Sequence, residues 1–423
     1  MDEKQKKKDN QLKRGLNRRH LQMIAIGGSI GTGLFLAMGG TIRSAGPGGA
    51  MVGYAIMGII VYCMMTALGE LATEYPVPGA FTAYANRFID PAWGFTNGWS
   101  YWFGSSMTVA AELIAGSIIV KYWFPGTSSA LWAALFLAVL LALNLFSVKG
   151  FGEAEFWFAG IKVVVTVIFL IVGVLMIIGI MHSGEDAGFH NWTLDAGADG
   201  KAPFLHGFGG IVGILLVAAF SFSNTELVGL SAAESANPKE DVPKSIHSVF
   251  WRLMIFYLGT IFVVATLIPF TEPSLLTAII AATAFIASMI GDGVAYTAAY
   301  YLCGIAGVYN WLTISVAHYR FRKGWIKQGH SLDELEYKSP FYPWGSWLCI
   351  IVCIVVCFGA NWQVFTDFNW FDFLTCYGII PISIAMFFIY KKKRKTKWVA
   401  YEDMDLSQPE DMAEARKHMS GME

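Results

Sequence analysis

Two stretches of this 423-residue chain carry residue types that could do chemistry. The first runs from Ala25 to Phe35 and holds four glycines within seven positions. Each glycine disfavours a helix by up to about 1 kcal/mol relative to alanine. A helix broken here would direct unpaired N–H groups and a positive half-helix dipole into an apolar segment, which suits a carboxylate. A small-residue face for helix packing explains the same spacing equally well.

The second stretch, Phe220–Gly229, places hydroxyl and amide side chains and the carboxyl of Glu226 in the middle of another apolar segment. Acidic residues are costly in lipid and are functional by default. Glu226 could meet a substrate amine, carry a proton or cap a broken backbone. The alternative is a neutral glutamic acid that is hydrogen-bonded for structural reasons. A dinucleotide site at the glycines is not favoured, because no strand or βαβ unit surrounds them.

The composition identifies the elements that hold these stretches as membrane helices. The chain is 55% hydrophobic and 14% charged, with a mean hydropathy of +0.50, whereas soluble domains carry about 25% charged residues. A net charge of −1 and the lack of one basic surface argue against nucleic acid as a partner. We expect no cofactor or metal site, and we interpret Cys349, Cys353 and Cys357 as packing residues.

Apolar blocks of about 20 residues, the length that spans hydrocarbon as a helix, divide the chain into ten predicted spans. They are Leu21–Thr41, Ala50–Leu71, Phe95–Val120, Leu131–Val148, Phe158–Met181, Phe208–Ala233, Phe250–Pro269, Val294–Ala317, Trp344–Phe358 and Phe371–Tyr390.

The lysines and arginines near these blocks predict the orientation, because basic loops stay in the cytoplasm. The count places both termini and Lys323 inside and the loop 182–207 outside. This assignment keeps the basic segments after Thr277–Ile290 in the cytoplasm only if that short run does not span the membrane. We therefore expect Thr277–Ile290 to be re-entrant or to lie at the outer surface. The predicted regions are a basic tail (1–20), a first repeat (21–181), the external loop (182–207), an incomplete second repeat (208–317), a loop with two helices (318–390) and a cytoplasmic tail (391–423), helical or disordered from Tyr401.

Interruptions in the first and sixth blocks indicate two inverted repeats of five helices with a binding site at their interface. The chain resembles the bacterial amino acid permeases of the amino acid–polyamine–organocation superfamily, most closely the lysine-specific permeases. The resemblance rests on motifs that cover nearly the whole chain in order: Arg19–Ile24, Gly27–Phe35, Ala45–Ala50, Gly69–Ala72, Gly98–Trp102, Ser147–Glu155, Thr225–Leu227 and Ala317–Arg322.

The resemblance implies an all-α integral membrane protein with an inverted-repeat fold, five helices plus five, and two extra C-terminal helices. It implies amino acid import coupled to protons across the bacterial cytoplasmic membrane, with membrane lipid as the surroundings. The implied substrate-binding residues are Ser29, Ile30, Gly31, Thr32 and Gly33 for the α-carboxylate, Ser221, Phe222, Ser223 and Asn224 for the α-amine, and Tyr101 for the pocket wall. Lys162 is the implied proton-coupling group. Glu226 is predicted in both roles from its place in an apolar segment. The alternative for Lys162 is an anchor at the membrane surface, and for Tyr101 a packing aromatic.

The chain departs from the lysine permeases in two places. Ser105 stands where they have a large aromatic residue, which changes the pocket wall, and Glu112 further along this helix could attract a cationic side chain or be a bonded structural acid. About one helix is missing between Leu276 and Thr277, the eighth of the fold. The interpretations left open are a working permease and a transport-incompetent truncated one. A membrane enzyme is not indicated, because no paired catalytic groups appear.

Overall fold

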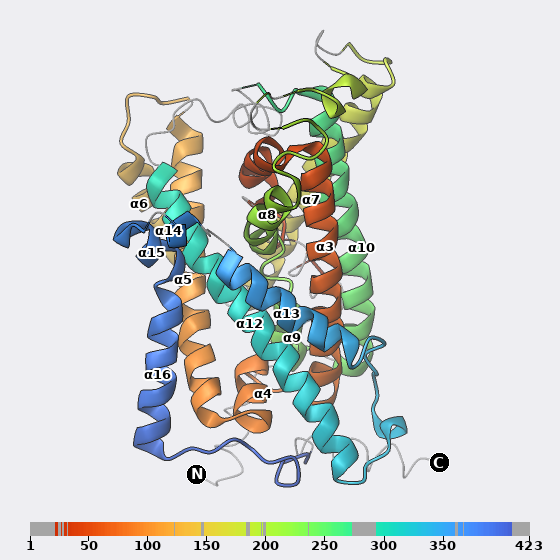
Figure 1. Ribbon diagram of the computed structural model, residues 1–423, viewed down its shortest axis with the longest axis vertical. Helices are drawn as coiled ribbons and strands as arrows, with labels where there is room; N and C mark the ends of the chain where they lie inside the picture. The colour runs from red at the N-terminus through yellow and green to blue at the C-terminus, as the bar shows by residue number, and fades with distance from the viewer. Residues whose placement is uncertain are drawn as a thin grey trace.

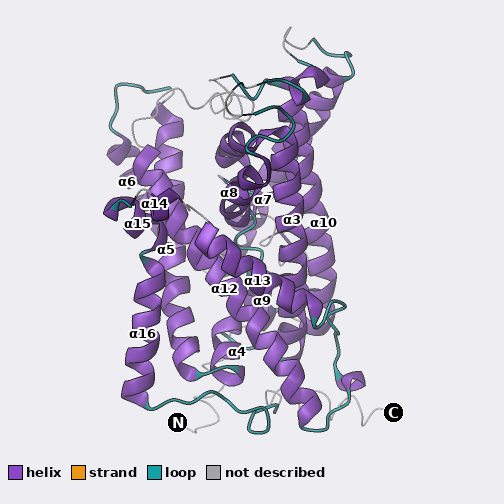
Figure 2. Cartoon of the chain, in the orientation of Figure 1, coloured by secondary structure: helices purple, strands orange, loops and turns teal. Residues whose placement is uncertain are grey.

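In a computed structural model of the protein, all the regular secondary-structure elements of the described residues are helices (Figures 1 and 2). The structure describes residues 22–23, 27, 29–31, 33–121, 123–144, 148–182, 187–195, 197, 200–235, 237–272, 293–359, 363–366 and 368–407. The predicted all-α class is therefore confirmed. Thr32 and the run Thr277–Ile290 lie outside the described residues.

The helices of the first half follow the predicted apolar blocks only in part. They are η1 (Gly33–Ala37), α3 (Met38–Glu74), α4 (Ala80–Phe88), α5 (Pro91–Lys121), α6 (Ser129–Asn144) and α7 (Val148–Ile177). Helix α3 covers parts of the first two blocks, and α4 lies between the second block and the third. The helices of the second half are η2 (Phe189–Trp192), α8 (Gly207–Ser221), α9 (Leu227–Ser231), η4 (Ala232–Glu234), α10 (Pro238–Leu267), α12 (Gly293–Lys327), η5 (Leu332–Glu334), α13 (Trp344–Gly359), α14 (Gln363–Thr366), α15 (Trp370–Tyr377) and α16 (Ile379–Arg394).

Helix α3 lies at the centre of the packing, against α8, α10, α12 and α13, while α12 crosses the molecule obliquely and packs along α5 (Figure 1). Among the described helices, α3, α10 and residues 156–177 of α7 are each long and apolar enough to cross a membrane. Few of these α7 residues are buried although they are apolar, and many of their large side chains are exposed. Apolar exposure on this scale is expected of a surface that faces lipid.

The first two predicted spans, which end at Thr41 and begin at Ala50, are not separated by a loop. Helix α3 continues through the residues between them, with a break only at Gly46. Gly46 has a φ of +77°, a conformation that glycine adopts at little cost. A Cβ there would lie 2.7 Å from the Pro203 carbonyl oxygen. The Pro203 oxygen accepts hydrogen bonds from the N–H groups of Gly48 and Gly49, at 2.8 and 3.1 Å. The loop before α8 thus closes over this break.

The predicted span Phe208–Ala233 is interrupted between α8 and α9, as predicted. Other predicted helix bounds are wrong, and the span Phe371–Tyr390 is divided at Gly378. Helix α12 continues past Ala317 to Lys327, and α10 begins at Pro238 rather than Phe250. Hydropathy finds only the apolar part of a helix, whereas hydrogen-bonded turns continue into polar sequence.

The tail after α16 is neither helical nor detached where the structure describes it. Residues 396–407, which we call the C-terminal strap, contain no helix and include a turn in which the Asp403 N–H donates to the Ala400 carbonyl. The N–H of Val399 donates to the Ile89 carbonyl at 2.9 Å. The Gln328 side-chain amide donates to the carbonyls of Tyr401 and Met404, at 3.0 and 2.8 Å. The expectation of a helical or disordered segment from Tyr401 is therefore wrong as far as Ser407.

The basic segments gather at one end of the molecule. Arg320 on α12 donates to the carbonyl of Val399 in the strap, and Lys327 pairs with Glu402. The loop that contains η2 lies at the opposite end (Figure 1). The arrangement agrees with the side assignment that the ten-span count requires, although the number of crossings stays a prediction.

Candidate functional site

Two helix interruptions from distant parts of the sequence face each other in the core. After a helical residue at Ser29 the chain bends at Ile30 and Gly31, and π-helix η1 begins at Gly33. Helix α8 ends at Ser221, and a turn follows in which Asn224 has a φ of +68°. The predicted interruptions are therefore present where the structure describes them.

Gly33 brings the two interruptions into backbone contact. A Cβ at Gly33 would lie 2.6 Å from the Cα of Ser221, a separation that no larger residue allows. The two explanations left open for the glycine-rich stretch thus apply to different positions. The bend at Ile30 and Gly31 interrupts the helix, and Gly33 permits close helix packing.

Tyr257 on α10 joins the two interruptions. Its hydroxyl lies 2.6 Å from the carbonyl oxygens of both Ser29 and Ser221, which share its single proton. Tyr54 on α3 places its hydroxyl 2.9 Å from the Ser221 Oγ and stacks on Tyr257 with ring centroids 5.6 Å apart. Sequence reasoning missed both tyrosines, because nothing marks a tyrosine in an apolar helix as one that reaches a broken helix.

The hydroxyl groups of the second interruption bond to nearby backbone. Ser223 donates to the Phe220 carbonyl at 2.5 Å, and Thr225 donates to the Phe222 carbonyl at 3.0 Å. The ring of Phe222 is buried against Tyr257, with centroids 4.7 Å apart. The hydroxyl groups of Ser223 and Thr225 therefore bond within their own turn, whereas Phe222 contacts a distant helix.

Glu226 is buried beside α12. It is 2% exposed, and its Oε2 accepts a hydrogen bond from the indole N–H of Trp311 at 3.1 Å. An indole donates to a neutral carboxylic acid and to a carboxylate alike. The geometry is therefore compatible both with a proton carrier and with a structural acid.

Lys162 connects α7 to the segment before the first interruption. Its half-buried ammonium group donates to the Gly27 carbonyl oxygen at 3.0 Å. Carbonyls in the last turn of a helix lack helical partners and carry the negative end of the helix dipole, so they favour a cation. The structure thus brings Lys162 to the residues just before the predicted carboxylate-binding segment.

Two residues of α5 complete the surroundings. The Glu112 carboxyl reaches the first interruption, since a Cβ on Gly31 would lie 3.2 Å from its Oε1. Tyr101, predicted to line the pocket, is half-buried and packs against Phe81 of α4 with ring centroids 4.8 Å apart. Within the described residues, no group of three or more His, Cys, Asp or Glu side chains could hold a metal ion.

Comparison with known proteins supports one family. Residues 20–286 and 274–401 match the amino acid permease family. A lysine-specific permease of Escherichia coli is 36% identical, over 94% of this chain and 97% of that protein. A lysine-specific permease of Lactococcus lactis is 35% identical, over 95% and 94%. A histidine permease of Lactococcus lactis is 34% identical, over 94% and 98%.

The alignment with the first of these relatives extends over 478 positions, more than the 423 residues of this chain. That relative therefore contains sequence with no counterpart here. The likeness nevertheless runs from one end of the chain to the other, and nothing in it supports the alternative of a transport-incompetent protein. The relatives are permeases rather than enzymes.

Proposed function

The chain belongs to the amino acid permease family, and from that premise we propose that it imports amino acids by proton symport, with a preference for cationic ones such as lysine. The observation that carries this proposal is the meeting of two helix interruptions at Tyr257. Interrupted helices at matching places in two repeats are the expected construction of a substrate site in such transporters.

The proposed contacts follow from the polarity of the interrupted helices. The helix that starts at Gly33 presents N–H groups and a positive dipole end to the substrate carboxylate. The carbonyls from Ser221 to Asn224 accept hydrogen bonds from the substrate ammonium group. Tyr257 holds both backbones at one depth, so that an α-amino acid can contact the two together.

Glu112 supports the proposed cationic preference. Its carboxyl lies against Gly31, beside the proposed carboxylate site, on a helix that belongs to neither interruption. A cationic side chain that extends from the bound amino acid toward α5 would meet an opposite charge. The names of the relatives include lysine and histidine permeases, which agrees with a basic substrate.

Proton coupling is assigned to Lys162, with Glu226 as the second titratable group of the site. A protonated Lys162 donates to Gly27 and holds α7 against the first interrupted helix. Loss of the proton would remove the charge from this bond and loosen the contact, which would link the proton to helix movement.

We further propose that the chain keeps the five-plus-five organisation but lacks about one helix near Leu276, the eighth. Supporting this, the two stretches that match the family overlap at residues 274–286, as expected if the chain rejoins family sequence there after a gap. We place both termini in the cytoplasm of a bacterium, since basic segments remain on that side.

Uptake into proteoliposomes tests the proposal. Purified protein is supplied with radiolabelled lysine, arginine, histidine and neutral amino acids, with and without an inward proton gradient. We expect the gradient to drive accumulation of cationic amino acids, and Lys162→Ala to abolish the gradient's effect. Glu112→Gln should raise the KM for lysine by about tenfold, the effect of roughly 1.4 kcal/mol of lost charge attraction, and leave neutral substrates unchanged.

The matched controls are Lys244→Ala and Glu240→Gln, because these two residues form an exposed pair on one turn of α10. Both should transport like the unchanged protein. If an inserted and folded protein accumulates no amino acid under any gradient, the transport proposal is wrong. If it accumulates amino acids without a proton gradient, only the coupling is wrong.

A further inference from the structure

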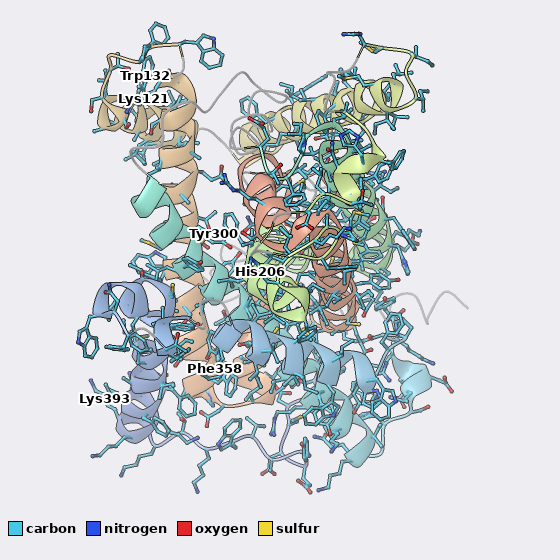
Figure 3. The ribbon with its side chains drawn as sticks, turned by 45° about the horizontal axis from the view of Figure 1, so that its top comes forward. Lys121, Trp132, His206, Tyr300, Phe358 and Lys393 are labelled. Carbon is cyan, nitrogen blue, oxygen red and sulfur yellow. The ribbon has the colours of Figure 1, made fainter. Side chains whose placement is uncertain are left out.

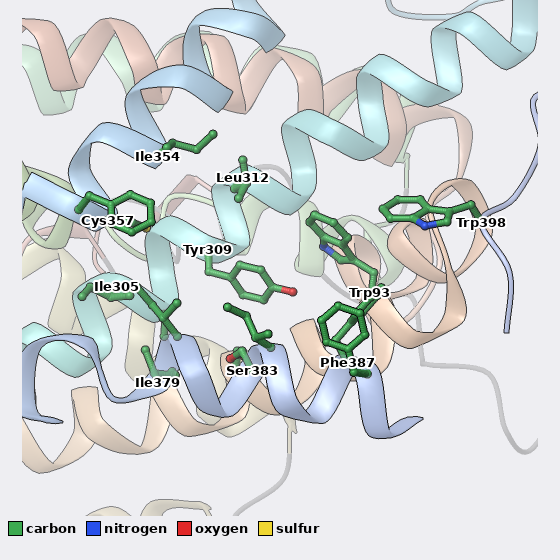
Figure 4. Close-up of a pocket in the computed structure, with 16 residues that line it drawn as sticks. Trp93, Ile305, Tyr309, Leu312, Ile354, Cys357, Ile379, Ser383, Phe387 and Trp398 are labelled. Atoms are coloured by element: carbon green, nitrogen blue, oxygen red, sulfur yellow. The ribbon is translucent and has the colours of Figure 1, made fainter. Parts of the chain in front are cut away.

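A groove on the side of the molecule lies apart from the helix interruptions. It has a volume of about 290 Å³ and is enclosed by α5, α12, α13 and α16 (Figure 4). Trp93, Tyr309 and Phe387 line one part of it, and Ile354, Cys357 and Ile379 line another. None of the residues assigned to the amino acid site lines this groove.

The walls of the groove suit a hydrocarbon chain. Nearly all of its lining side chains are aliphatic or aromatic. Two of the hydroxyl groups on the wall, those of Ser100 and Ser383, lie 3.0 Å apart and hydrogen-bond to each other. These two hydroxyl groups hydrogen-bond to each other rather than to an occupant of the groove. An apolar occupant would therefore leave few polar groups without partners.

The groove opens on the apolar exterior. Four of its lining residues, from α13 and α16, have large exposed fractions: Ile354 46%, Phe358 59%, Ile384 53% and Phe388 62%. In a membrane this exterior is occupied by lipid tails. An occupant would therefore enter sideways from the bilayer rather than from water.

One end of the groove adjoins a basic cluster. Lys391 at the end of α16 lies over the rings of Phe387 and Trp398, at 5.2 and 5.1 Å from their centroids. Lys391 is itself paired with Asp90. Its neighbours Lys392, Lys393 and Arg394 are exposed, and Lys393 projects away from the helix end (Figure 3). Lys395 and Lys397 extend the basic run.

We propose that this groove binds one acyl chain of an anionic glycerophospholipid, whose phosphate group lies on the cluster formed by Lys392, Lys393 and Arg394. The two halves of the site match the two halves of such a lipid: an apolar groove open to the bilayer, and cations at the depth of the headgroups. Clusters of lysine and arginine next to a membrane helix attract anionic lipids. Aromatic rings such as Trp398 commonly lie at the same depth.

Photolabelling of the full chain in phosphatidylcholine nanodiscs tests this site. The probe is phosphatidylglycerol with a diazirine at the end of one acyl chain, compared with phosphatidylcholine that carries the same chains. We expect the anionic probe to label Ile354, Phe358 and Ile384 at least about fivefold more strongly, the factor associated with one basic side chain at an anionic surface.

Two variants separate the parts of the site. Replacing Lys392, Lys393 and Arg394 together with glutamine should remove the preference for the anionic probe. Ile384→Trp, which fills the groove, should reduce labelling of Ile354 and Phe358 by both probes. Ile382→Trp is the matched control, because Ile382 is 60% exposed on the same helix but does not line the groove.

Equal labelling by the two probes, unchanged by the glutamine variant, would mean that ordinary surrounding lipid contacts this surface, and the headgroup assignment would be wrong. Unchanged labelling in Ile384→Trp would show that the chain does not enter the groove. Gel filtration and thermal unfolding establish that each variant is folded. Should Ile384→Trp not fold, Ile384→Phe takes its place, and the glutamine variant tests the site independently.

Discussion

Tyr257 is the side chain on which the contact between the two interrupted helices depends. Its hydroxyl donates to the carbonyls of Ser29 and Ser221, which are 228 and 36 positions away in sequence. The ring is fully buried between Tyr54 and Phe222. Loss of the hydroxyl alone would leave the ring packing in place and two buried carbonyls without this donor.

We expect Tyr257→Phe to lower the free energy of unfolding by about 1–3 kcal/mol, the range for a buried group left without its partner, and to reduce the uptake rate. Thermal unfolding in detergent and uptake in proteoliposomes measure the two effects. Tyr62→Phe is the matched control, because the Tyr62 hydroxyl bonds His247 at 2.9 Å in an exposed place. Equal effects of the two variants would contradict the bridging role.

Glu70 is the centre of a buried charged cluster near the basic end of the molecule. Arg322 donates to both of its carboxylate oxygens, at 2.5 and 2.6 Å, and the Ser339 N–H donates to Oε2 at 2.7 Å. His318 Nε2 lies 3.3 Å from the same oxygen. The cluster ties α3 to α12 and to the loop before α13.

Glu70→Gln should lower the free energy of unfolding by about 3–5 kcal/mol, because Arg322 would remain buried without a counter-charge. Glu240→Gln, which breaks the exposed pair with Lys244, should cost at most about 1 kcal/mol. Denaturation in mixed micelles measures both changes. A loss in Glu70→Gln no larger than in the control would show that Arg322 finds another partner.

The C-terminal strap connects several helices at the basic end of the molecule. Arg87 on α4 donates to the carbonyls of Asp405 and Ser407, and Tyr75 donates to Leu406 at 3.1 Å. Met404 is buried, and a Cβ on Gly324 would lie 2.4 Å from its Sδ. The strap therefore joins the segment around α4 to α12, two regions far apart in sequence.

Met404→Ala should loosen the strap but leave its hydrogen-bonding groups in place. Truncating a buried methionine to alanine lowers the free energy of unfolding by about 2–5 kcal/mol. Hydrogen exchange of the backbone at 399–407 should accelerate. Glu402→Gln serves as the control, because Glu402 forms an exposed ion pair with Lys327. Such exposed pairs contribute little to the free energy of unfolding. Unchanged exchange in Met404→Ala would mean that polar bonds alone hold the strap.

Asp90 makes the start of the strap sensitive to acid. Burial raises the pKa of its carboxyl, but hydrogen bonds from Lys391, from the Ala92 N–H and from Thr396 outweigh burial and hold the pKa below its ordinary value. Stability from a lowered pKa is present above the unfolded value of about 3.9 and is lost as the pH falls through the folded value.

Asp90→Asn should therefore destabilise the protein at pH 6. The difference from the unchanged protein should shrink below about pH 4, where the Asp90 carboxyl is protonated first in the unfolded state and, at still lower pH, in the folded state. Unfolding free energies of the two proteins at pH 6 and pH 3 provide the comparison. A difference that stays constant across this range would show that the Asp90 charge contributes nothing to the strap.

At the scale of the whole molecule, the loop around η2 and the basic end containing Lys323 lie at opposite ends (Figure 1). We expect a membrane-impermeant maleimide to label His190→Cys on intact cells and to label Lys323→Cys only after lysis. The unchanged protein, whose six cysteines are mostly buried, gives the background. Labelling of Lys323→Cys from outside would overturn both the orientation and the prediction of ten spans.

Much of the fold followed from local properties of the sequence. The ends of α13 agree closely with the apolar block Trp344–Phe358, because that helix is apolar almost to its ends. Clustered glycines and polar residues located both interruptions, since helix stability responds to residue type over a few positions. The burial of Glu226 was expected on the same ground, from its place within an apolar block.

The all-α membrane class, the family resemblance and the places where two helices break could all be predicted from the sequence. The contacts that hold those breaks together and cover the helix ends became clear from the packed helices: Tyr257 between Ser29 and Ser221, Glu112 against Gly31, and the strap on Gln328. The physical reason is distance along the chain. Helix formation and membrane insertion depend on neighbouring residues, whereas these contacts join residues that only the packing of whole helices brings within hydrogen-bond range.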